Sequence, residues 1–137
     1  MAATHPSVHQ RLIGWNLFAY GLTGYYFWAA NYWGDDPWSV PSGPGSSIRR
    51  GGTLYYPHPR TGMPLPILRR EACRRGFQDY QYLVQFTEAH RQGKIPPQRY
   101  AKIARRIDQY GKFGRWDQVK WGDLEDVRAQ IGVLLSK

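Results

Sequence analysis

The residues that could support acid–base chemistry are few, and two of them are adjacent. Asp35 and Asp36 follow a run of aromatic residues, so they could act as a pair of carboxylates in general acid–base catalysis. Asp-Asp-Pro is equally typical of a loop, where an Asp side chain hydrogen-bonds its own backbone before a proline. We assign no catalytic residue on this pattern and keep the two aspartates as an open alternative.

Metal and thiol chemistry have less support. The four histidines, His5, His9, His58 and His90, lack the spacing of a ligand set, so no metal site is predicted. Cys73 is the single cysteine, which excludes an internal disulfide and a thiolate metal centre. Its predicted role is packing. No cofactor is predicted, and the sequence does not indicate where in the cell the protein is located.

Aromatic side chains are the most distinctive chemical feature of the chain. Aromatic residues make up 15% of the 137 residues, including 6 Trp and 10 Tyr. Such side chains offer rigid, partly polar surfaces for binding, although many serve only to fill a core. Trp38 lies in a polar loop, where a Trp is expected only if something packs on it. Asn31, Trp33, Trp38 and Tyr56 fall at or just past the ends of predicted strands, and they are the candidate binding residues.

The charge is strongly positive and uneven. The formal net charge is +9, and the excess begins after the first aromatic segment, with seven arginines against Glu71 between residues 48 and 75. A basic surface can attract polyanions, so a small basic module that binds a polyanion or partner protein is the alternative function. No nucleic-acid recognition motif accompanies the charge, and no apolar run approaches the length of a membrane span, so neither specific nucleic acid nor a membrane is a predicted partner.

The elements that would position these residues alternate between helix and strand. Apolar spacing predicts a helix over residues 9–20, and residues 24–33 predict a strand that is apolar on both faces, as in a parallel sheet. A Gly-, Pro- and Ser-rich loop over 34–51 precedes a second short strand at 52–56.

Three helices are predicted in the remainder of the chain. The first starts at Pro66, ends near Gln92 and carries its apolar stripe on Cys73, Phe77, Tyr80, Val84 and Thr87. Its Gly76 suggests close packing against a neighbour. The second runs from Pro97 to Gly111, and the third begins with Asp123 as N-cap. Arg69 with Glu71, or Arg74 with Asp79, are predicted structural ion pairs.

Several motifs in this order resemble the C-terminal part of the catalytic domain of glycoside hydrolase family 123 and its uncharacterised relatives. The resemblance covers roughly Arg11 to Leu83, includes Gly52-x-Leu54-x-Tyr56-Pro57 and Arg74-x-Gly76-x-x-Asp79-Tyr80, and rests on the spacing over this whole span. The family pattern Pro-Ser-Ile-Arg at the helix start appears as Pro66-Ile67-Leu68-Arg69, so a hydroxyl is lost there. The other carrying residues are Trp15, Gly24, Tyr26, Trp28, Asn31, Trp33, Pro37, Trp38, Glu71 and Leu83.

The resemblance implies an α/β fold made of the last two strands and following helices of a (β/α)8 TIM barrel, an incomplete barrel. Residues 1–95 would form the barrel segment and 96–137 a helical extension. The implied substrates are β-linked amino sugar glycosides, cleaved with help from two carboxylates that lie upstream of the matched part. The chain alone is therefore expected to be inactive and to contribute an aromatic wall through Asn31, Trp33, Trp38 and Tyr56. It is also expected to self-associate or to require the missing barrel half.

Overall fold

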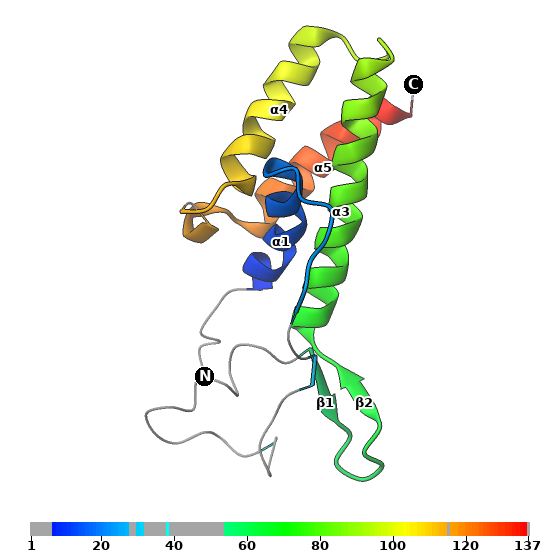
Figure 1. The fold of residues 1–137 in the computed structure, drawn as a ribbon, viewed down its shortest axis with the longest axis vertical. Coiled ribbons are helices and arrows are strands. Elements are labelled where there is room, and N and C mark those ends of the chain that lie inside the picture. Colours follow the sequence, from blue (N-terminus) through cyan, green and yellow to red (C-terminus); the bar gives the residue numbers. More distant parts are fainter. Residues whose placement is uncertain (1–6, 28–29, 32–37, 39–53, 115, 137) are drawn as a thin grey trace.

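The computed structural model describes residues 7–27, 30–31, 38, 54–114 and 116–136. Helix α1 (Ser7–Ala19) is followed, as the next described element, by a hairpin of β1 (Tyr55–Pro57) and β2 (Pro64–Pro66). Then follow α3 (Leu68–Arg91), α4 (Pro97–Gly111), the 3-10 helix η1 (Trp116–Gln118) and α5 (Trp121–Leu135). The helices gather at one end and the hairpin projects from the start of α3 (Figure 1). Within the described residues, no helix is long and apolar enough to cross a bilayer.

The predicted barrel is wrong, because the described strands form a two-stranded antiparallel hairpin beside a helical bundle. Tyr55 pairs with Pro66 and Pro57 with Pro64, and the turn between the strands contains Gly62 in the left-handed region, at a φ of 68°. A connection this short can join only antiparallel strands, since parallel strands need a long crossover. The second predicted strand, at 52–56, is therefore found only in part, as β1.

The strand predicted over 24–33 is also absent from the part of it that is described. Residues 24–27 carry no strand pairing, and Tyr26 is 87% exposed, so the segment is not buried on both faces. Its rings pack on a helix instead, with Tyr25 6.1 Å from Phe77 of α3 between ring centroids. The aromatic residues that favoured a strand here are partly buried by contact with α3 instead, because an aromatic ring can bury its surface against a helix as well as in a sheet.

The predicted helices are present, with shifted starts. Pro66 belongs to β2, so α3 begins at Leu68, and it ends where Gly93 adopts a φ of 74°. Pro97 occupies the first turn of α4 as predicted. Asp123 is not the N-cap of α5, since it lies inside the helix. Its carboxylate accepts the backbone N–H of Lys120 at 2.8 Å, which satisfies one of the free donors at the helix start.

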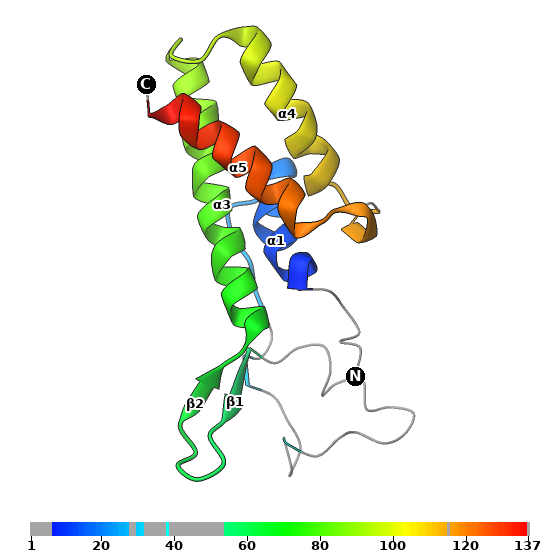
Figure 2. The same cartoon turned by 180° about the vertical axis from the view of Figure 1, so that it is seen from behind.

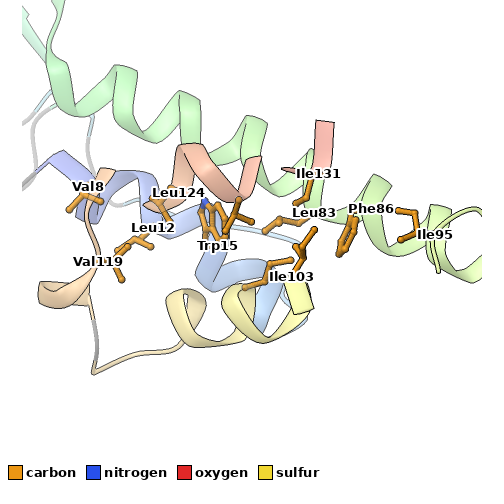
Figure 3. Packing of buried hydrophobic residues seen from close by; sticks show 12 residues of the cluster. Val8, Leu12, Trp15, Leu83, Phe86, Ile95, Ile103, Val119, Leu124 and Ile131 are labelled. Carbon is orange, nitrogen blue, oxygen red and sulfur yellow. The ribbon is translucent and has the colours of Figure 1, made fainter. Parts of the chain in front are cut away.

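Helix α1 is the centre of the bundle. Its Leu12 and Trp15 are fully buried, and they pack with residues from α3, α4 and α5 (Figure 3). The other core residues labelled there are Val8, Leu83, Phe86, Ile95, Ile103, Val119, Leu124 and Ile131. Seen from behind, α5 crosses the face of the bundle between α3 and α4 (Figure 2). Residues on both sides of position 95 thus build one core.

Glycines allow α1 to approach its neighbours at backbone distance. A Cβ added to Gly14 would lie 1.9 Å from the carbonyl oxygen of Gly76, and one added to Gly76 would lie 2.3 Å from that of Arg11. On the other side, a Cβ at Gly111 of α4 would lie 2.7 Å from the carbonyl oxygen of Trp15. The close packing predicted from Gly76 is confirmed, and the contact is with α1.

We therefore expect Gly76→Ala to destabilise the fold although Ala is the better helix former. Overpacking against the Arg11 carbonyl should cost about 1–3 kcal/mol, which exceeds the gain of about 1 kcal/mol in helix propensity. Gly132→Ala is the matched control, because a Cβ there meets nothing within 4 Å. Urea denaturation should show a lower midpoint for Gly76→Ala and an equal or higher midpoint for Gly132→Ala. Equal effects of the two substitutions would contradict the close helix crossing.

Candidate functional site

The most concentrated polar chemistry in the described structure surrounds the buried carboxylate of Asp79. Its Oδ2 accepts hydrogen bonds from Arg11 Nε at 2.6 Å and Trp15 Nε1 at 2.9 Å, and its Oδ1 accepts one from Arg128 Nη1 at 2.6 Å. The side chain of Asp79 is 1% exposed and that of Arg11 is fully buried. One carboxylate therefore joins α1, α3 and α5 through charged and neutral donors.

A second carboxylate closes this cluster on the solvent side. Glu125 of α5 accepts from Arg11 Nη1 at 2.6 Å and from Arg75 Nη2 at 3.1 Å. Burial acts to raise the pKa of Glu125, but hydrogen bonds and Coulomb attraction from Arg75 and Arg11 outweigh it, so the pKa lies below its ordinary value. The arginines also lie over aromatic rings: Arg11 is 4.5 Å from the Trp121 centroid, and Arg128 is 4.0 Å from that of Tyr82.

The Asp79 cluster is built for structure and not for catalysis. Both oxygens of Asp79 are occupied by protein donors, and its burial leaves no room for a substrate. The predicted partner of Asp79 was Arg74, and this pairing is wrong, because Asp79 faces the core while Arg74 faces solvent. Sequence reasoning also missed Arg128, although its position four residues after Leu124 places it on the buried face of α5.

A separate ion-pair group fixes the hairpin to the start of α3. Glu71 pairs with Arg70 and with Arg74, whose Nε lies 2.7 Å from Glu71 Oε2, so the predicted partner Arg69 is wrong. These hydrogen bonds, that from Arg74 first, lower the pKa of Glu71. Arg70 Nε also donates to the hydroxyl of Tyr55 in β1 at 3.2 Å. The group is on the surface and its role is to orient the hairpin.

Three of the four candidate binding residues fall within the described structure. Trp38 and Tyr56 lie together, with ring centroids 5.3 Å apart and planes inclined by 43°, and Trp38 is 51% exposed. Exposed Asn31 follows Ala30, whose carbonyl oxygen accepts the N–H of Leu54 at 2.7 Å, so Asn31 lies beside the start of β1. Trp33 lies outside the described residues. The aromatic pair thus lies at the hairpin and not at the mouth of a barrel.

A small cavity of about 110 Å³ lies between α1, the start of α3 and the aromatic segment before the hairpin. Ile13, Tyr25 and Phe27 supply apolar walls, while Gln10 Oε1 and Arg69 Nη1 are buried without a hydrogen-bond partner among the described residues. The thiol of Cys73 also borders this cavity. Burial raises its pKa, so the thiol stays protonated near neutral pH and is not an activated nucleophile. Sequence reasoning gave no signal for this cavity.

The described residues offer no metal centre: none of their His, Cys, Asp or Glu side chains form a group of three that could hold an ion. His58 instead accepts the backbone N–H of Arg60 in the hairpin turn at 3.3 Å, and His90 stacks on Tyr100 with centroids 3.9 Å apart. Asp35 and Asp36, the alternative carboxylate pair, lie outside the described residues.

Comparison of the sequence with models of known protein families finds a match to one family. Residues 3–86 match the family described as "Glycoside hydrolase 123, catalytic domain". The match includes α1, the hairpin and α3 as far as Phe86, but neither α4 nor α5. No curated protein and no solved structure matches the chain.

The stability of the fold should depend strongly on the negative charge of Asp79, which pairs with Arg11 and Arg128. Asp79→Asn keeps the side-chain shape but leaves Arg128 without its counter-charge and buried Arg11 with Glu125 alone, so we expect a loss of about 3–5 kcal/mol in the free energy of unfolding. Glu71→Gln, which removes the exposed ion pairs at the start of α3, is the control and should leave the denaturation midpoint nearly unchanged. Equal midpoints for the two variants would show that the buried cluster is not required.

Glu125 should contribute to the pH dependence of stability. Because its folded pKa is depressed, its contribution is fully present above the ordinary value of 4.5 and is lost as the pH falls through the folded pKa. Glu125→Gln should therefore be less stable than the unchanged chain near pH 7. The difference should shrink as the pH falls below about 4.5. Chemical denaturation midpoints measured from pH 7 to pH 3 test this, and a constant difference across that range would contradict it.

Proposed function

Because the chain belongs to the glycoside hydrolase 123 catalytic domain family, we propose that it binds carbohydrate through the aromatic pair at its hairpin and is inactive as a hydrolase alone. The family relation confirms the resemblance seen in the sequence, and it associates the chain with carbohydrate substrates in general. The finer proposal concerns where the sugar lies and which sugar it is. We assign contacts to Asn31, Trp33, Trp38 and Tyr56.

The observation that carries this proposal is the placement of Trp38 on Tyr56. Their rings lie at 5.3 Å, and half of the Trp38 surface remains open to solvent. An exposed indole held by a second ring provides a rigid apolar plate, on which the C–H face of a sugar can stack. Asn31 beside β1 supplies an amide for the hydroxyl groups at the rim of such a plate. The hydrogen bond from Arg70 to the hydroxyl of Tyr55 helps to hold the hairpin that carries Tyr56.

The proposed sugar is a β-linked N-acetylamino sugar, as the family resemblance implies. Hydrolysis of such a glycoside with its own acetamido group as nucleophile needs one carboxylate to orient that group and another to protonate the leaving oxygen. The family places these in an adjacent Asp-Glu pair, and no Asp is directly followed by Glu in this sequence. We therefore propose that residues 1–95 retain the sugar-facing part of the family domain and that 96–137 are a helical extension. Self-association stays a prediction.

Binding of N-acetylgalactosamine should quench or shift the fluorescence of Trp38, with an affinity on the order of millimolar for a single exposed plate. Trp38→Ala should abolish the response, and Tyr56→Ala should weaken it by several fold because the indole loses its support. Trp121→Phe is the control, since Trp121 lies over Arg11 in the bundle. NMR chemical-shift changes in the backbone of residues 54–57 provide a second readout.

An assay with a nitrophenyl β-N-acetylgalactosaminide tests the catalytic half of the proposal. No turnover is expected, since the missing acid catalysis is worth roughly 10²–10⁴-fold in rate. Turnover that Asp36→Asn abolishes would show that the chain is an enzyme by itself. Sugar binding that survives Trp38→Ala would place the binding surface elsewhere.

A further inference from the structure

A second hollow among the described residues lies far from the hairpin, between the first half of α4 and the last half of α5. It is an open groove of about 390 Å³. Buried Ile103 and half-buried Leu134 form its floor, and Ala129 and Val133 form a wall that is open to solvent, with Val133 60% exposed. The two helices that form it flank each other in the view from behind (Figure 2). Neither helix is part of the family match.

The α4 rim of this groove is positively charged, and its only described electrostatic partner is Asp126, which Lys102 attracts without a direct ion pair. Arg99 and Lys102 are exposed on the rim, and neither forms a hydrogen bond or ion pair with any residue that the structure describes. The nearby carboxylate, Asp126, is already held by Arg106 at 2.6 Å and by Gln130 at 3.0 Å. The groove therefore combines an apolar lining with two exposed cations along one side, neither of them in a direct ion pair.

From this combination we infer that the α4–α5 groove binds an amphipathic helix of a partner protein, with an acidic flank turned toward α4. A helix lays its apolar ridge into such a groove through residues spaced i, i+3, i+4 and i+7. Glutamates next to that ridge would reach Arg99 and Lys102, and these pairs would set the direction in which the partner helix lies.

A second copy of this chain does not fit the groove. The chain carries a net charge of +9, so two copies meeting through this face would bring Arg99 and Lys102 of each near those of the other. Like charges placed together at an interface oppose association. The complementary partner must therefore be acidic, which distinguishes the groove from the surface that self-association would use.

The test uses a synthetic peptide of about 16 residues with blocked ends, long enough for a marginally stable helix. Leucines occupy one stripe and glutamates occupy the positions beside it. We expect saturable binding to the intact chain by fluorescence anisotropy at roughly 0.15 M salt, where distant charges are screened. A peptide of the same composition with its leucines spread around the helix, and one with lysine for glutamate, should bind at least tenfold more weakly.

Three single substitutions locate the binding. Val133→Asp and Lys102→Glu should each weaken binding at least tenfold. The first places a carboxylate in the apolar wall of the groove, and the second reverses the charge on its α4 rim. Both side chains are exposed, so folding should be retained, which thermal unfolding verifies. Arg60→Glu is the matched control, since it makes the same charge change on the hairpin, at the opposite end of the molecule (Figure 1).

The inference is overturned by absence of saturable binding, or by equal binding of the peptide whose leucines are spread around the helix. It is also overturned if Arg60→Glu weakens binding as much as Lys102→Glu, because the attraction would then come from net charge alone. A dimer in light scattering that Val133→Asp converts to monomer would assign the groove to a second copy instead.

Discussion

The buried carboxylate of Asp79 is the constraint on which the arrangement of the helices depends. Desolvating a carboxylate and a guanidinium costs several kcal/mol each, and the cost is offset only when geometry and hydrogen bonding are nearly complete. Here three donors from two other helices meet the two oxygens of Asp79. A shift of α1 along α3 would separate Arg11 and Trp15 from Asp79 together. The cluster therefore specifies one register of the bundle more strongly than apolar contacts alone could.

Such a cluster requires the backbones to be close, and the glycines provide this. Gly76 precedes Asp79 by one helical turn, so the same face of α3 presents first a bare backbone and then a carboxylate. Arg74 in the same motif points outward to Glu71, while Tyr80 packs edge-on against Phe18 at 6.2 Å. Within Arg74-x-Gly76-x-x-Asp79-Tyr80, Gly76, Asp79 and Tyr80 thus serve helix packing, and Arg74 pairs with Glu71 on the surface.

The sequence predicted most helices because their apolar spacing is local, and it failed where burial depends on distant partners. On α3 the predicted stripe included Phe77 and Val84, which are 39% and 43% exposed, and omitted Asp79 and Gly76, which are buried. A prediction based on hydrophobicity alone placed the buried face of α3 at the wrong angle around the helix axis, because two of the buried positions, Gly76 and Asp79, are not hydrophobic. The aromatic run from Tyr25 predicted a strand for a similar reason: its composition fits a buried sheet, but the neighbour in the structure is α3.

The buried Asp79 cluster also explains why the helical bundle and the hairpin end of the molecule differ in how they are held. Glu125 and Arg128 of α5 complete a cluster that begins with the Arg11–Asp79 pair in the family-matched part, so a helix beyond the match supplies further partners for both buried groups. Among the described residues, the hairpin that carries Tyr56 is held by the hydrogen bond from Arg70 of α3 to Tyr55 and by backbone hydrogen bonds from Leu54 and Tyr55 to the carbonyl oxygen of Ala30. The bundle is therefore the rigid support, and the two surfaces that we propose for recognition lie outside its core: the Trp38–Tyr56 plate at one end and the α4–α5 groove at the other.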